Sequence, residues 1–108
     1  MHRPISEADW KLFRQLQPIA LERLCERALS DVEKLIASSK KSAHERYLQL
    51  YKLLERKEEE IAQAFNDLRR STAWFQIARI QSQGLFTEEE FERFSPETHQ
   101  AVKVLMGG

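Results

Sequence analysis

A long stretch without glycine or proline sets the first constraint on the fold. From Ala43 to Gln83 the chain contains neither of these residues, the two that most disfavour a helix interior. Ser42 and Glu45 have the spacing of a capping box, so we expect a helix to begin near Ala43. A helix of about 40 residues would be about 60 Å long. Since a compact domain of this chain length has a diameter of roughly 35 Å, an elongated molecule is predicted.

Apolar and aromatic residues recur along this predicted helix in alternating steps of four and three. This heptad spacing is typical of a helix that packs nearly parallel to its partners. The row consists of Tyr47, Tyr51, Leu54, Glu58, Ile61, Phe65, Leu68, Thr72 and Phe75. Glu58 is a polar member in the middle of the row, and a break in the helix near this residue is an alternative. We expect an interface formed by Tyr47, Tyr51, Leu54, Ile61, Phe65, Leu68 and Phe75.

A second apolar row precedes this segment and predicts an amphipathic partner helix. Its members are Leu21, Leu24, Cys25, Ala28, Val32, Leu35 and Ile36. Further upstream, Ser6 followed by Asp9 predicts a helix start. Pro18 either kinks that helix or begins a new one. The serine- and lysine-rich segment 38–42 separates the two rows and predicts a turn.

Three signals organise the C-terminal part of the chain. Gly84 fits a helix end, and Thr87 with Glu90 forms a capping box. The pair Ser95–Pro96 has the order of an N-cap followed by the first helical residue. A final helix would direct Ala101, Val102 and Leu105 toward the core. The predicted fold class is therefore all-α, a long antiparallel helical hairpin or bundle with a short C-terminal helical cap, in a single domain over residues 1–108.

Composition excludes several environments. The 17 Lys and Arg residues balance the 17 Asp and Glu residues, so no net field attracts nucleic acid or an anionic membrane. The single cysteine, Cys25, excludes an internal disulfide and fits a reducing compartment. No segment approaches the roughly 18 consecutive apolar residues of a membrane span. The N-terminus lacks the apolar stretch of a signal peptide. We expect a soluble, cytoplasmic protein that does not contact a membrane.

No motif predicts catalysis, a metal site or a cofactor. His44 begins the sequence HERYL, which resembles the start of a zinc-protease signature, but Leu48 occupies the position of the second histidine. Neither His44 nor His99 follows a glutamate by three residues, the spacing that di-iron bundles use. Arg93 and His99 loosely resemble the arginine–histidine pair of some all-α ribonucleases, but a surface arginine followed by a surface histidine is far commoner. We therefore expect no enzyme activity, no metal and no cofactor.

The segment AFNDLRRSTAWF, residues 64–75, places charged side chains between bulky apolar ones. On a helix, Asp67 would pair with Arg70, and Arg70 would lie against Trp74, as on an ordinary solvated face. The alternatives are a protein interface or a phosphate site. In either case the candidate partner patch consists of Arg69, Arg70, Trp74 and Arg79. Because so few arginines neutralise few phosphates, a protein is favoured over nucleic acid as the partner.

These features predict a non-catalytic helical module for protein–protein interaction or regulation. The uncovered apolar row of an elongated hairpin favours a second copy, so we expect a homodimer. An unidentified protein partner is the alternative occupant. The second hypothesis is a weak nucleic-acid-binding helical protein, and its binding residues would be Arg69, Arg70 and Arg79 with Lys40 and Lys41.

Overall fold

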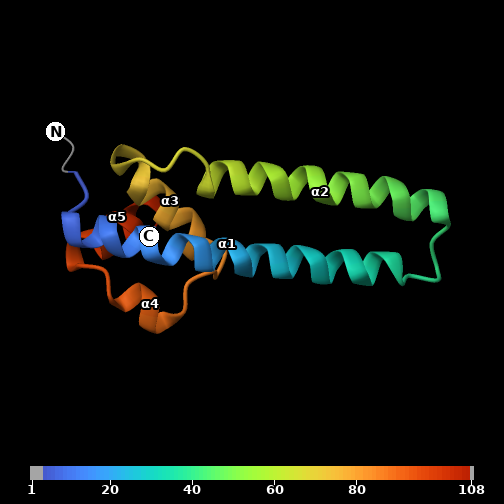
Figure 1. Ribbon diagram of the computed structural model, residues 1–108, viewed down its shortest axis with the longest axis horizontal. Helices are drawn as coiled ribbons and strands as arrows, with labels where there is room; N and C mark the ends of the chain where they lie inside the picture. The colour runs from blue at the N-terminus through green and yellow to red at the C-terminus, as the bar shows by residue number, and fades with distance from the viewer. Residues whose placement is uncertain (1–3, 108) are drawn as a thin grey trace.

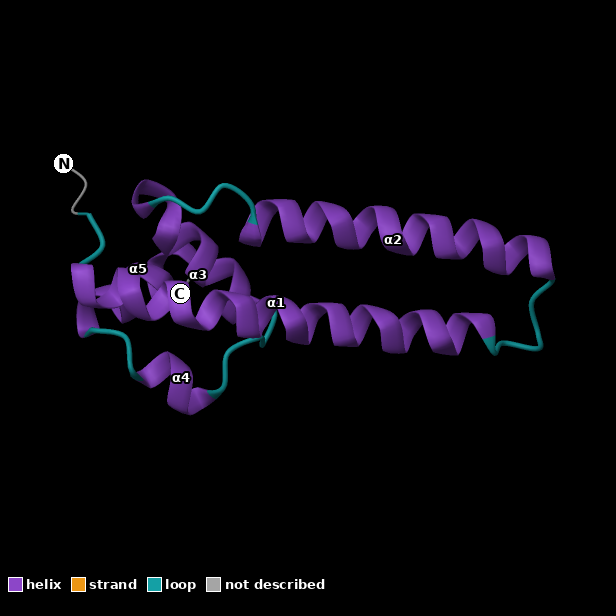
Figure 2. Cartoon of the chain, viewed as in Figure 1, coloured by secondary structure: helices purple, strands orange, loops and turns teal. Residues whose placement is uncertain are grey.

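The computed structural model of the chain describes residues 4–107 and confirms the all-α fold class. This part of the chain contains no strand (Figure 2). The elements are α1 (Glu7–Ile36), α2 (Ala43–Phe65), the 3-10 helix η1 (Arg70–Thr72), α3 (Ala73–Ser82), α4 (Glu88–Glu92) and α5 (Pro96–Leu105). α1 and α2 run antiparallel, and the C-terminal helices gather around the N-terminal half of α1 (Figure 1). The principal extents are 53 × 27 × 25 Å, so the molecule is elongated.

Serine side chains cap the N-terminal ends of both hairpin helices, as the sequence predicts. The Ser6 hydroxyl accepts a hydrogen bond from the backbone N–H of Asp9 at 3.2 Å. The Ser42 hydroxyl accepts one from the backbone N–H of Glu45 at 3.1 Å. α1 continues through Pro18, so this proline does not begin a new helix. The connection 37–42 closes the hairpin at the end remote from α3, α4 and α5 (Figure 1).

The prediction of a single helix from Ala43 to Gln83 is wrong, because α2 ends at Phe65. α2 is uninterrupted at Glu58, so the alternative break there is wrong as well. The break follows at Asn66, which is extended at φ −82° and ψ 154°, and at Asp67, which has a φ of 55°. Asparagine and aspartate adopt the left-handed region more readily than other residues with a side chain. These two residues therefore end the helix without glycine or proline.

Side chains from other helices stabilise this break. A helix end leaves carbonyl oxygens without partners inside the helix. The carbonyl oxygen of Phe65 accepts a hydrogen bond from Gln17 Nε2 of α1 at 3.4 Å, and that of Asn66 accepts one from Gln76 Nε2 of α3 at 2.8 Å. Gln76 is 4% exposed, so its amide is committed to this contact. The chain then reverses and α3 packs back against α2.

The predicted helix end and helix starts of the C-terminal part are confirmed, and Val102 is buried as expected, but Leu105 is 39% exposed and does not point into the core. Gly84 follows α3 with a φ of 67°, a conformation that glycine adopts without a steric penalty. Thr87 and Glu90 form a complete capping box at the start of α4. Ser95 is the N-cap of α5, and Pro96 is its first helical residue.

A buried carboxylate joins the two ends of the chain. Asp9 of α1 is 4% exposed and accepts hydrogen bonds from the Ser95 backbone N–H at 3.0 Å and the Ser95 hydroxyl at 2.5 Å. It also accepts one from the Thr98 hydroxyl at 2.5 Å, and Thr98 in turn accepts one from Trp74 Nε1 at 3.0 Å. This network fixes the N-terminus of α5 against α1 and α3.

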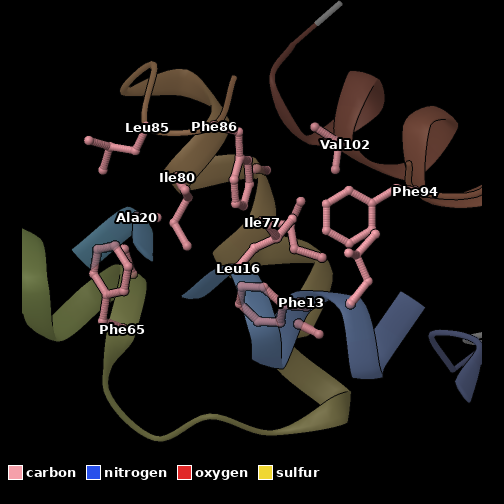
Figure 3. Packing of buried hydrophobic residues seen from close by; sticks show 14 of the residues in the cluster. Phe13, Leu16, Ala20, Phe65, Ile77, Ile80, Leu85, Phe86, Phe94 and Val102 are labelled. Carbon is pink, nitrogen blue, oxygen red and sulfur yellow. The ribbon is translucent and has the colours of Figure 1, made fainter. Parts of the chain in front are cut away.

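The hydrophobic core lies at one end of the hairpin. Its buried members come from the N-terminal part of α1, the end of α2 and the segment from α3 to α5 (Figure 3). The cluster includes Phe13, Leu16, Ala20, Phe65, Ile77, Ile80, Leu85, Phe86, Phe94 and Val102. No residue between Leu24 and Ile61 belongs to it or packs against it. Along the other half, the hairpin is only two helices thick (Figure 1).

Candidate interaction surface

α2 has the expected heptad spacing, but its contact row is shifted by one residue. Apart from Ile61 and Phe65, which pack in the core, the buried and half-buried residues of α2 form a row that faces α1 and consists of Arg46, Leu50, Leu53, Lys57, Glu60 and Ala64. Each precedes one member of the predicted row, from Tyr47 to Phe65. Lys57 and Glu60 form an ion pair at 3.3 Å within this contact row, which places their charges together at the edge of the seam.

The predicted interface residues therefore divide into two groups. Tyr47, Tyr51 and Leu54 are 69%, 64% and 48% exposed on the distal half of α2. Phe65 is buried in the core, and Ile61 and Leu68 are half-buried against it. These three side chains therefore pack against other residues of the same chain. Phe75 is exposed but lies on α3, a separate helix, so it does not extend the row on α2.

Two exposed apolar residues of α1 lie on the same side of the hairpin as the exposed residues of α2. Leu29 and Ile36 each follow a contact residue of α1, Ala28 or Leu35, by one position. Every right-handed helix turns in the same sense from one residue to the next. In an antiparallel pair, the positions that follow the contact residues of the two helices therefore share one side. We call this side the hairpin face and define it by Leu29, Ile36, Tyr47, Tyr51 and Leu54.

The C-terminal segment packs on the other side of α1 and leaves the hairpin face open. Arg27 lies about 160° around α1 from Leu29. It donates hydrogen bonds to the carbonyl oxygens of Gln83 at 2.6 Å and Gly84 at 2.8 Å, in the connection that follows α3. Arg23 donates to Glu90 at 2.6 and 3.0 Å and to the Leu85 carbonyl oxygen at 2.9 Å. The hydrogen bond with Arg23 lowers the pKa of the Glu90 carboxyl group.

Carboxylates border the hairpin face. Glu22 lies seven residues before Leu29, in the same row of α1 as Leu29 and Ile36. Glu26 and Glu33 lie next to this row on α1. Glu58 follows Leu54 by four residues on α2, and all four glutamates are exposed. Between residues 22 and 58, the lysines and arginines of α1 and α2 lie on the opposite side of the hairpin, except for Arg46 and Lys57, which are half-buried in the contact row. The opposite side mixes both signs, with Arg27, Lys34, Lys52 and Arg56 among Asp31, Glu45 and Glu59.

Two of the three arginines of the predicted partner patch, Arg69 and Arg70, have acidic partners within the chain. Arg69 pairs with Asp67 at 2.8 Å, and Arg70 pairs with Glu7 at 2.6 Å. Arg70 also lies 5.8 Å from the centre of the Trp10 ring, so the predicted contacts of Arg70 with Asp67 and Trp74 are wrong. Residues 66–69 are not helical, which removes the spacing on which those contacts depended.

The remaining two members of that patch, Trp74 and Arg79, have different surroundings. The Trp74 indole is half-buried and donates its N–H to Thr98, so it belongs to the network around Asp9. Arg79 is exposed on α3. The segment AFNDLRRSTAWF thus contains a helix end, a turn and a helix start, and its charged residues pair within the chain, Asp67 with Arg69 and Arg70 with Glu7.

The described residues contain no group of His, Cys, Asp and Glu side chains that could hold a metal ion. His99 Nε2 lies 2.8 Å from the Phe91 carbonyl oxygen, at a hollow of about 270 Å³ that Lys103 and Met106 also line. Cys25 is half-buried in α1. No helix in this part of the chain is both long and apolar enough to cross a membrane.

Comparison with protein-family models, with curated proteins and with solved structures gave no match for this chain. The function is therefore inferred from the surface. Of the residues on the hairpin face, the sequence analysis named Tyr47, Tyr51 and Leu54 as interface candidates, did not name Leu29, and placed Ile36 in the apolar row of the partner helix. The signal that was available is the pair Leu29 and Ile36, one heptad apart and directly beside the contact row of α1.

Proposed function

We propose that this chain is a non-catalytic helical module that binds another protein along the hairpin face. The observation that carries the proposal is the group of five large apolar side chains, between 48% and 69% exposed, on one side of the hairpin. Taking about 200 Å² for each residue, their exposed surface is on the order of 600 Å². The largest apolar patch on a typical monomer covers roughly 300–600 Å² and is often functional, and these side chains reach the upper end of that range.

The alternatives have less support. Nucleic-acid binding would use Arg69, Arg70 and Arg79 with Lys40 and Lys41. Two of these five residues already have acidic partners, since Arg69 pairs with Asp67 and Arg70 pairs with Glu7. Nucleic-acid binding stays a prediction. Measuring whether an oligonucleotide binds at low salt would test it. The homodimer expected from the sequence also stays a prediction, and it is one possible outcome of the experiment below.

Site-specific photo-cross-linking tests the proposal with a matched control. A benzophenone side chain replaces Tyr51 on the hairpin face or, as the control, Lys52 on another side of the same helix. Both residues are exposed, so neither replacement disturbs the core. We expect discrete protein adducts from position 51, in cells that express the chain natively, and none of these from position 52.

A second variant shows whether the adducts depend on the apolar surface. Leu29→Gln removes a large apolar side chain from the α1 side of the face without touching the cross-linking position. The adducts from position 51 should decrease strongly in this variant. Equal adducts from positions 51 and 52, or none from position 51, would show that the hairpin face is not an interaction site.

A further inference from the structure

The hairpin face combines a narrow apolar surface with a border of one charge sign. Leu29 to Ile36 on α1 and Tyr47 to Leu54 on α2 each span seven residues, a rise of about 10.5 Å along the helix axes. The apolar side chains of the two helices lie on either side of the seam, so they form the two walls of a surface two helices wide. A single helix of about four turns, laid along that seam, would cover them and complete a three-helix arrangement.

The border of the face selects among helical partners by charge. Glu22, Glu26 and Glu33 flank it on the α1 side and Glu58 flanks it on the α2 side, with no lysine or arginine among them. An occupant with basic flanks would pair with these carboxylates, and one with acidic flanks would be repelled.

A second copy of the chain fits this face poorly. In a two-fold symmetric contact, the same surface of both copies meets itself, so these glutamates would face glutamates. A second copy would therefore bring like charges together along the border of the face.

From these observations we infer that the occupant of the hairpin face is a basic amphipathic helix of another protein. This inference rests on the proposed function and names the class of partner. The apolar stripe of the partner helix contacts Tyr47, Tyr51 and Leu54 on one wall and Leu29 and Ile36 on the other. Lysines or arginines on its flanks pair with Glu26 and Glu33 on α1 and with Glu58 on α2.

A pair of designed peptides tests the charge requirement. Both peptides have about 14 residues and leucines at positions i, i+3, i+4 and i+7. One carries lysines on both flanks of the leucine stripe and the other carries glutamates at the same positions. Fluorescence anisotropy of the labelled peptides measures their affinity for the full chain. We expect the lysine peptide to bind, and to bind more weakly as salt is raised, and the glutamate peptide not to bind.

Two matched charge reversals on the protein distinguish an effect of the charges at the hairpin face from an effect of the net charge of the chain. Glu26→Lys with Glu33→Lys reverses the border of the face, and Asp31→Lys with Glu59→Lys makes the same change in net charge on the other side. All four residues are exposed, and circular dichroism checks that both variants remain helical. The first variant should bind the lysine peptide about tenfold more weakly than the second, because two attractive pairs become repulsive. It should also gain affinity for the glutamate peptide.

The outcomes distinguish a wrong partner class from a wrong surface. Equal loss in both double variants, or equal affinity for both peptides, would overturn the inference of a basic helix. So would light scattering that shows a dimer which Tyr51→Ser dissociates. In each of these cases adducts from position 51 would leave the proposed function intact. Failure of both peptides together with the absence of those adducts would refute both.

Discussion

The network around Asp9 gives the strongest prediction for stability. The Asp9 carboxylate accepts hydrogen bonds from three donors, of which the Thr98 hydroxyl is almost fully buried and the two donors of Ser95 are partly accessible. Replacing Asp9 with alanine removes every one of these acceptors at once. The donors then face a site from which water is largely excluded.

The size of the effect follows from the burial of each donor. A hydrogen bond to a charged group contributes about 1.5–3 kcal/mol, and a buried donor left without an acceptor costs about 1–3 kcal/mol. The half-buried donors of Ser95 can recover part of this by binding water, whereas Thr98 cannot. We expect Asp9→Ala to lower the free energy of unfolding by about 3 kcal/mol, or the melting temperature by roughly 10–20 °C for a domain of this size.

Two controls isolate the network from the loss of a charge. Glu7→Ala also removes an acid from the first turn of α1, but Glu7 is exposed and pairs with Arg70 at the surface, so we expect a loss below about 1 kcal/mol. Thr98→Val removes the buried hydroxyl at nearly constant volume. In a double-mutant cycle measured by urea unfolding, Thr98→Val should cost at least about 1 kcal/mol less when Asp9 is already alanine. Additive effects, or equal losses for Asp9→Ala and Glu7→Ala, would refute the network as a source of stability.

Two further predictions test the seam and the α4 contact. Leu53→Ala should destabilise the chain by about 2 kcal/mol and Leu54→Ala by less than about 0.5 kcal/mol, because only the first faces α1; thermal unfolding of both variants measures the difference, and a reversed order would place the wrong row in the seam. The pKa of Glu90 is lowered by its hydrogen bond with Arg23, so its contribution to stability is present above the ordinary pKa of a glutamate and is lost as the pH falls through the lowered folded-state value. Urea midpoints between pH 7 and about pH 3 should therefore fall less in Glu90→Gln than in the unmodified chain, and parallel curves would contradict this reading.

The sequence predicts the period of α2 correctly because heptad spacing is a property of one helix. The row occupied by Leu50 and Leu53 and the row occupied by Tyr51 and Leu54 have the same spacing and lie side by side. Periodicity cannot decide which of these rows packs against α1. The structure places Leu53, which is 9% exposed, in the seam, and leaves Tyr51 and Leu54 exposed beside it.

The features that the sequence did not reveal depend on contacts between distant segments. Asn66 and Asp67 permit a helix end, but Gln17 and Gln76 satisfy its carbonyl oxygens from two other helices. Asp9 has the local spacing of a helix cap, whereas its carboxylate contacts a residue 86 positions away. By contrast, the caps at Ser42, Thr87 and Ser95 involve neighbours three residues apart, and these were predicted correctly.

The separation of core and hairpin face has a consequence for how this chain would work as a binding module. The buried cluster lies around Phe13 and Ile77, so side chains on the distal hairpin can change without loss of the core. That freedom carries a risk, since an exposed apolar row favours association with further copies of the same chain. On the proposal made above, the glutamates from Glu22 to Glu58 reduce this risk, because they repel an identical face and attract one of opposite charge. The same four carboxylates would thus keep the apolar row exposed in the free chain and determine which helix covers it.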